Sequence, residues 1–410
     1  MARSGILFFY FIVLAFLLTL LPSRAFADFK LLDAIEELGE RRFVKSQPDR
    51  LVWKPVRIHP TLRTSVEYDD NILLEKDDPR EDVVFNIKPG AVIEVPLGKH
   101  QFSSGYEAEF EVFTKNQKQN DQNQAFFSLL DLHFPDWYVN ILETLKETSS
   151  RAGTTFSNRI PRIDQSVNPK VGYRWKRTIF ETGFRHFYRN FRKEGNSAFD
   201  FHVLEWTEVV YYDLFARLKA LGEYQVANIA YPHNHRRDAI VQQARVGLEG
   251  EVHPNVTVKF RIGPQFRNYQ YTPKPNFNSW VADLKVNYQV RKNWKLNAEA
   301  AREAVEATFG DVNYYKEHAI RLGLEYTFRP QWILYTKGGF ARHDYAERAT
   351  LDNRTAFRRD KLATFEAGLR YLMREWLEFQ LAYEYLRRDS NFQPFDYSDN
   401  RVSLTSALTY

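Results

Sequence analysis

Charged side chains recur at every second position along much of the chain, and this spacing is the first pointer to chemistry. Glu107, Glu109 and Glu111 follow one another in this way, and so do Lys259 and Arg261. Two carboxylates on one face of a strand lie about 7 Å apart and could resemble the carboxylate pair of an active site. A strand whose charged face lines a water-filled space explains the same spacing without any further catalytic group.

Other catalytic or metal-binding patterns are weak. His233 and His235 are two residues apart and could ligate a metal, but two histidines at this spacing are weak evidence for a metal site. The sequence contains neither a Gly-x-Ser-x-Gly motif nor a His-Glu-x-x-His motif. A Ser–His pair assembled from distant strands stays open. The prediction is a protein that is not an enzyme, with no catalytic residues, no metal site and no cofactor.

The elements that carry these charges are predicted to be β-strands with one apolar face. Residues 85–95, 256–266 and 280–290 each alternate apolar and polar side chains, as a half-buried strand does. Charges at alternate positions cannot sit in a dry core without extensive pairing. They can face a wet lumen while the apolar side faces lipid. The chain is 16% aromatic yet low in mean hydropathy, which is typical of a membrane barrel because only alternate residues face lipid.

The connections between these strands are of two kinds. Tight turns are expected at 96–100, 253–255 and 329–332, and longer polar loops at 146–162 and 345–360. Short turns on one rim and long loops on the other are typical of outer-membrane barrels. Counting the strands predicts an all-β protein, a transmembrane antiparallel up-and-down β-barrel of about 18 strands, with 16 as the alternative. An even number places both chain ends on the same rim, which we expect to be periplasmic.

Aromatic residues mark the predicted rim of short turns. The tryptophans that follow tight turns are interpreted as an aromatic girdle at the level of the lipid headgroups; they are Trp137, Trp294, Trp332 and Trp376. The chain ends on Tyr410 inside an alternating stretch, which predicts a last strand that runs to the end of the chain. This ending resembles the terminal strand signature of outer-membrane proteins, which is read by the barrel assembly machinery.

The N-terminus divides into two short segments before the barrel. Residues 1–27 have the features of a secretory signal peptide, including an apolar run and a small-residue cleavage signature, and an uncut membrane anchor is the alternative. Residues 28–55 are predicted as a periplasmic segment with a short amphipathic helix, and residues 56–410 as the barrel in the outer membrane of a Gram-negative bacterium. Whether residues 28–55 act as a tether, a plug or a docking peptide stays open. The chain has no cysteine and a formal net charge of +5, so neither disulfides nor a nucleic-acid partner is expected.

The inward-facing charges carry both signs, and we predict that some of them line a path through the lumen. Opposite walls of opposite sign would produce a transverse field, whereas a fully paired wall would give no selectivity. Arginines could also hold the carboxylates of an anionic polymer through paired hydrogen bonds, and Tyr211 and Tyr335 are possible inward aromatics. The pore-lining candidates are Arg185, Arg245, Lys259, Arg261, Arg321, Arg370, Glu107 and Glu109.

Two stretches, residues 61–113 and 373–410, carry a resemblance to a known family. The first contains the loop Tyr68-Asp69-Asp70-Asn71-Ile72 and the turn Pro96-Leu97-Gly98-Lys99-His100. The second contains Tyr383, Tyr385, Arg387, Arg388, Ser390 and Asn391, and then Phe395, Tyr397, Asp399, Asn400 and Arg401. These motifs resemble the putative β-barrel porin type 2 family, whose barrels are found with exopolysaccharide export systems. The middle of the chain matches only in its barrel pattern.

The resemblance implies an outer-membrane channel that exports a secreted exopolysaccharide, with no catalytic residues. The partners that it implies are the secreted polysaccharide and the periplasmic and inner-membrane machinery that makes and exports it. Outer-membrane lipid, lipopolysaccharide and the barrel assembly machinery are expected partners of any such barrel. A general or small-solute porin is the alternative function, and a lipid- or glycan-modifying enzyme and an adhesion barrel are further ones, because fold alone does not define function.

Overall fold

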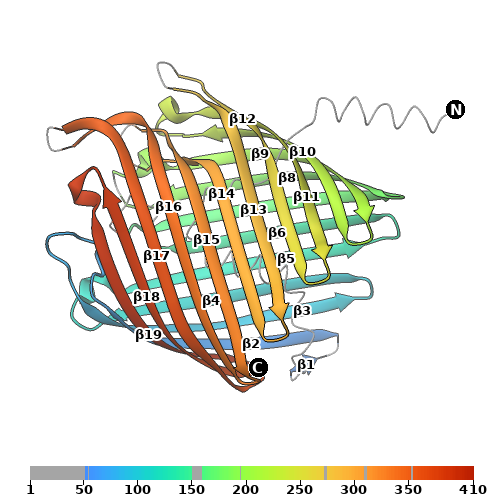
Figure 1. The fold of residues 1–410 in the computed structure, drawn as a ribbon, viewed down its shortest axis with the longest axis horizontal. Helices are drawn as coiled ribbons and strands as arrows, with labels where there is room; N and C mark the ends of the chain where they lie inside the picture. The colour runs from blue at the N-terminus through green and yellow to red at the C-terminus, as the bar shows by residue number, and fades with distance from the viewer. Residues whose placement is uncertain are drawn as a thin grey trace.

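The protein is a closed antiparallel β-barrel in a computed structural model (Figure 1). The structure describes residues 51–410 apart from 54, 150–158, 194, 272–274, 309–311 and 352–353. The predicted signal peptide and the predicted amphipathic helix therefore lie outside the described residues. In the described part no helix is long and apolar enough to cross a membrane.

Eighteen long strands make the barrel, and the two-residue strand β1 (Val52–Trp53) pairs with the first of them. The predicted number of 18 is thus confirmed and the alternative of 16 is wrong. The strands are β2 (Val56–Asp69), β3 (Asp82–Leu97), β4 (His100–Phe113), β5 (Asp121–His133), β6 (Trp137–Thr148), β7 (Arg162–Trp175), β8 (Thr178–Phe191), β9 (Phe201–Phe215), β10 (Leu218–Ala230), β11 (Ala239–His253), β12 (Val256–Tyr269), β13 (Phe277–Arg291), β14 (Trp294–Glu306), β15 (Tyr314–Arg329), β16 (Trp332–Leu351), β17 (Arg354–Arg374), β18 (Leu377–Ser390) and β19 (Tyr397–Thr409).

Each strand pairs with its neighbour in sequence, and the last strand closes the barrel on the first. Along the β19–β2 seam Arg401 is opposite Asp69 and Thr409 is opposite Thr61. The amide of Tyr410 donates to the carbonyl of Pro60 at 3.0 Å, so the final residue belongs to the barrel as predicted. Closure removes the unpaired strand edges that lipid could not satisfy. In Figure 1 strands β13 to β19 cross the front of the barrel and the early strands cross behind them.

Side chains alternate between a lipid-facing outer surface and the lumen, as the strand period requires. On β16, Leu334 and Phe340 are exposed on the outside, whereas Tyr335 and His343 are buried on the inside. Tyr335 donates to the lumen-facing Glu366 of the next strand at 2.9 Å. The charged side chains at alternate positions of each strand therefore face the lumen, because the outer face must be apolar over most of its height.

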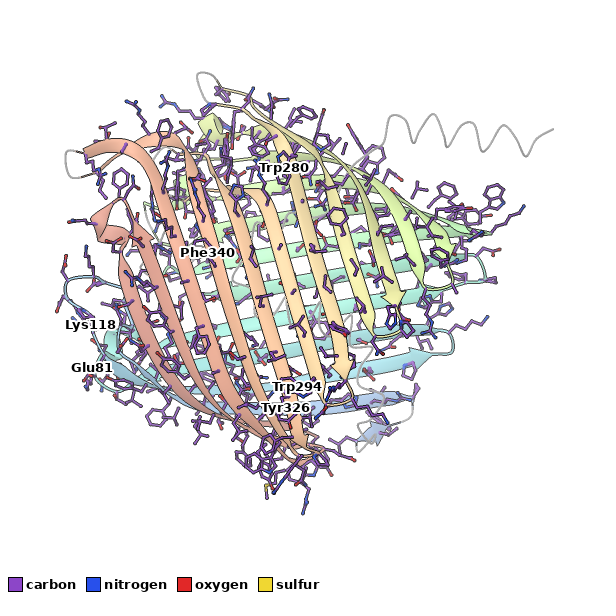
Figure 2. The ribbon with its side chains drawn as sticks, viewed as in Figure 1. Glu81, Lys118, Trp280, Trp294, Tyr326 and Phe340 are labelled. Atoms are coloured by element: carbon purple, nitrogen blue, oxygen red, sulfur yellow. The ribbon has the colours of Figure 1, made fainter. Side chains whose placement is uncertain are left out.

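The two rims differ in the length of their connections. At the short-turn rim, β3 and β4 are joined through Gly98, whose φ of +69° suits glycine. Trp294 stacks on Tyr326 with ring centroids 4.3 Å apart, and Trp332 on Tyr371 at 4.4 Å. Figure 2 shows Trp294 and Tyr326 together at this end of the barrel. These pairs agree with the predicted aromatic girdle.

The long-loop rim carries the other connections, four of which contain a single 3-10 turn. These turns are η1 (Gln117–Gln119), η2 (Ser197–Phe199), η3 (His235–Arg237) and η4 (Gln393–Phe395). The long loop predicted at 345–360 is wrong, because β16 and β17 continue as a paired hairpin from Arg348–Phe357 to Leu351–Arg354. The turn between Phe215 and Leu218 was not predicted, since it contains no Gly, Pro, Asn or Trp.

Candidate functional site: the charged lumen

The most buried lumen charges form a network on β10 to β13. Glu223 is fully buried, and its carboxylate accepts a hydrogen bond from Arg245 Nε at 3.0 Å. Arg261 is 2% exposed, with Nη1 3.9 Å from Glu223 and Nη2 3.6 Å from Glu249. Arg245 also donates to Asp283. Some of these contacts join strands that are not direct neighbours, such as β10 with β12 and β11 with β13. They therefore link four strands and offset the cost of burying the charges.

The other predicted arginines face the lumen and also have acidic partners. Arg185 contacts Glu205 at 3.0 Å, and Arg370 contacts Glu325 at 2.6 Å. Arg321 is the most open, with a half-exposed side chain whose Nη1 lies 4.0 Å from Glu299. The structure thus places these arginines along the wall rather than in one binding pocket.

The acidic wall lies on β3 and β4. Glu109 accepts from Lys88 and from Asn123 Nδ2, the latter at 3.3 Å. Glu107 lies on the same face one pleat away and is half-buried. Glu111 is paired with Arg159 from the long loop before β7. The three glutamates share one face of a strand as predicted, but their partners are cations of the same wall.

The acidic and basic walls lie on opposite sides of the barrel. In a closed ring of the eighteen strands β2 to β19, β12 and β13 are halfway round from β3 and β4. The lumen face of β3 and β4 carries Glu94, Glu107, Glu109 and Glu111 against Lys88. That of β12 and β13 carries Lys259, Arg261, Arg267 and Lys285 against Asp283. Excess charge of opposite sign on facing walls produces a field across the lumen.

The long-loop end of the basic wall is covered by two connections. Arg237, in the loop before β11, is 1% exposed and lies over the Phe199 ring at 4.9 Å. Its guanidinium donates to the carbonyl oxygens of Ala307 and Val312, the latter at 2.9 Å. This side chain therefore ties the loop between β14 and β15 to the loop between β10 and β11.

Further contacts join the β10–β11 loop to the end of β14. Tyr231 donates its hydroxyl to Glu306 at 2.9 Å, and Arg267 donates to the same carboxylate. Burial raises the pKa of the Tyr231 phenol well above its usual range, so the hydroxyl keeps its proton for this bond. Beneath the junction lies a buried inward-facing cluster of Phe187, Phe201, Val203, Ala227, Ile229 and Val241.

The barrel seam holds a cluster of carboxylates around an arginine. Oxygens of Asp69, Asp70 and Asp399 lie within 4.8 Å of one another. Arg401 lies among them, with Nε 3.2 Å from Asp69 and Nη2 2.6 Å from Asp399. Asp70 accepts two hydrogen bonds from Asn400, each of 2.7 Å. The guanidinium offsets part of the negative charge of Asp69 and Asp399, whereas Asp70 is held by a neutral side chain.

Four lumen charges were not predicted from the sequence: Arg162, Asp164, Arg358 and Asp360. Asp164 accepts from Arg162 at 3.0 Å and from Arg189 at 2.6 Å, and all three are buried. Arg358 and Asp360 are fully buried and paired at 2.6 Å. Both cases are an Arg-x-Asp triplet within a strand, which places the two charges on one face. The Arg-x-Asp spacing could have predicted these paired lumen charges from the sequence. No comparable pattern in the sequence pointed to the buried loop residue Arg237.

Comparisons with known proteins agree with this architecture. A sequence model of the family described as "Putative beta-barrel porin 2" matches residues 201–410. This range includes the resemblance at 373–410 but not the one at 61–113. A search of curated proteins found no match.

Similar solved structures have very different sequences. OccK2 (OpdF) of Pseudomonas aeruginosa is 10% identical with a TM-score of 0.50, over 87% of this chain and 98% of that one. The outer membrane protein OpdK of the same organism is 11% identical with a TM-score of 0.49, over 87% and 99%. OccAB4 of Acinetobacter baumannii is 10% identical with a TM-score of 0.49, over 89% and 100%. At such identities the likeness concerns the fold alone. The chain belongs to the putative beta-barrel porin 2 family and is a porin-like β-barrel of the outer membrane.

Proposed function

We propose that this barrel is a passive channel for small polar or charged solutes. The observation that carries the proposal is the excess of opposite charge on the facing walls of the lumen. A transverse field favours solutes that carry a charge or a dipole, because such solutes can orient in it while they pass. An eighteen-strand barrel is wide enough to enclose an aqueous path.

The contact geometry divides the lumen charges into two groups. Arg245 and Arg261 are buried and paired with acids, so they stabilise the wall and do not touch a solute. Arg321 and Lys337 have half-exposed or more exposed side chains, so a passing solute can reach them. We assign solute contact and most of the field to the exposed charges, and stabilisation of the wall to the buried ones.

The covered region near Arg237 supports small solutes over thick polymers. Loops on the β10–β15 side are joined to each other over inward-facing apolar side chains, which reduces the open part of the mouth. We place this long-loop rim at the cell surface, as in other outer-membrane barrels. Both the start of β2 and the end of β19 would then lie on the periplasmic side, as the sequence predicts.

Conductance of the purified barrel in planar bilayers tests the function directly. We expect stable ion conductance without any added protein, and uptake into liposomes that falls as uncharged oligosaccharides lengthen. Arg237→Ala should raise the size limit, because the two loops lose their tie, whereas the exposed neighbour Arg236→Ala should not. A barrel that conducts only when a periplasmic partner is added would contradict a passive channel.

Export of a secreted exopolysaccharide is the second candidate. It is supported by the family resemblance and by the row of basic lumen side chains, which could contact an anionic polymer. Deleting the gene in its native host should leave polymer or its precursors inside the cell if the barrel is an exporter, with rescue by the intact gene. Unchanged surface polysaccharide would leave the small-solute channel as the function.

A further inference from the structure

In the described part of the barrel, arginine and lysine side chains border the apolar outer surface on one side. On each strand, the apolar outer surface ends toward the long-loop rim at a first polar side chain that faces outward. On the five consecutive strands β14 to β18 this side chain is basic or a histidine; the residues are Arg302, His318, Arg342, Lys361 and Arg387. Neighbouring strands bring same-face side chains next to one another, so these charges form a continuous patch.

The next outward positions on the same strands extend the patch. Lys316 on β15 and Arg359 on β17 flank Asp344 on β16 in direct register. Asp344 accepts from Arg342 Nη2 at 2.9 Å and lies 3.7 Å from Arg359 Nε, so it orients both guanidinium groups. We call the set Arg302, Lys316, Arg342, Arg359, Lys361 and Arg387 the outer basic patch; Asp344 and Asp389 are the acids on the same face.

The outer basic patch borders the apolar belt directly. Ile320 and Phe340, one pleat below His318 and Arg342, are 58% and 51% exposed on the same face. Arg302 lies over the Trp280 ring at 4.1 Å, which is the arrangement of an aromatic side chain at a lipid headgroup boundary. Figure 2 shows Phe340 and Trp280 on the outer surface of the barrel. The basic groups therefore lie where acyl chains end and headgroups begin.

Among the described residues, no other strand has an Arg or Lys at the equivalent position. The position is a histidine on β8 and β9, His186 and His202. On the remaining strands the first polar outward side chains are neutral or acidic; examples are Gln124, Glu147, Gln165, Gln242, Asn268, Asn278 and Asn400. Cations needed only for general attraction to a headgroup layer would be spread around the circumference. Their confinement to five strands indicates a specific anionic ligand on that side.

We propose that the outer basic patch binds the phosphates of a phosphorylated glycolipid of the outer leaflet, lipid A. Arginine side chains hold phosphate through paired charge-assisted hydrogen bonds, and the acyl chains would lie on the apolar surface around Ile320 and Phe340. The outward orientation separates this site from the lumen. The proposal rests on the long-loop rim facing the cell surface, and not on the solute that the lumen passes.

The test measures lipid binding to the purified barrel in detergent, so transport plays no part in it. The variant Arg342→Gln/Arg359→Gln/Lys361→Gln removes three cations from the patch. A matched control, Arg80→Gln/Lys115→Gln/Lys118→Gln, removes three exposed cations from the long-loop rim beyond β2 to β5; Figure 2 places Lys118 and Glu81 there. Native mass spectrometry and titration would use bisphosphorylated lipid A, dephosphorylated lipid A and phosphatidylglycerol as probes.

Bisphosphorylated lipid A should bind the wild-type protein and the control equally, and bind the patch variant about 100-fold more weakly, since each of the three cations near a lipid surface contributes about a factor of five. Arg342→Lys/Arg359→Lys should weaken the binding less than the patch variant does, because the charge stays while the paired hydrogen bonds of arginine are lost. Equal binding of dephosphorylated lipid A, an equal loss in the control, or a preference for phosphatidylglycerol would overturn the proposal. The gel mobility of heated and unheated samples confirms that each variant forms the barrel.

Discussion

The acidic wall on β3–β4 and the basic wall on β12–β13 face each other, but they hold their charges differently. On the basic wall Arg261 and Arg267 are 2% exposed and enclosed by acids from other strands. On the acidic wall Glu107 and Glu109 are only partly buried, and the cation beside Glu109, Lys88, is also partly exposed. The first arrangement stiffens the wall, whereas the second leaves charge in reach of the lumen.

The charges of the lumen therefore serve two purposes. Buried charges must be paired, because an uncompensated charge away from water is costly. Exposed charges need no partner, and their pairs contribute little to stability. Position in the wall, more than residue type, therefore decides whether an arginine stabilises the barrel or meets a solute.

The largest expected effect is on stability, from the centre of the buried network. Glu223→Gln removes the charge that compensates Arg245 and Arg261, and should lower the free energy of unfolding by about 3 kcal/mol. Urea unfolding of the barrel in lipid, followed by gel mobility, measures this loss. The control Glu299→Gln removes a partly exposed acid near Lys285 and Arg321, and should cost less than about 1 kcal/mol. Equal losses would show that the two kinds of charge do not differ.

The next effect is on ion selectivity. Glu107→Gln/Glu109→Gln should shift the ratio of cation to anion permeability toward anions by up to about five-fold at low salt, since charges near a wide aqueous path act through a high dielectric. Lys259→Gln/Lys285→Gln should shift it toward cations by a similar factor. Reversal potentials across a salt gradient report both. Shifts of the same sign would refute opposed walls.

A smaller effect is expected from ionic strength. The selectivity of the unmodified barrel should fade between 0.1 M and 1 M salt, because the screening length drops from about 10 Å to about 3 Å. The stability difference between Glu223→Gln and the unmodified protein should persist, since buried pairs are screened much less. Selectivity that survives in 1 M salt would point to a narrow binding site instead of a field.

The smallest effect should come from Arg321→Gln. Its side chain is 51% exposed and its nearest acid oxygen is 4.0 Å away, so the change in unfolding free energy should stay below about 1 kcal/mol. Conductance should change slightly, because the group lies in the solute path. A loss as large as that for Glu223→Gln would mean that the exposed pairs also hold the wall.

Much of the fold was predictable because a β-strand repeats every two residues. Alternation placed Glu107, Lys259 and Arg321 on the inner face without knowledge of their neighbours, and the structure agrees. The strand number followed from counting alternating segments between turns. The hairpin beyond Ala349 was missed because its polar residues outside the membrane lack the apolar alternation on which the prediction depended.

The strands, their inward face and the sign of each charge therefore follow from the local sequence pattern. The tertiary structure decided which charges meet, because only closure brings β12 opposite β3 and seats Arg401 between Asp69 and Asp399. It also decided which charges are buried, since Arg237 reaches Ala307 and Val312 only when two distant loops fold together. Local alternation follows from backbone geometry, whereas pairing across the barrel depends on register and closure, which no single segment contains.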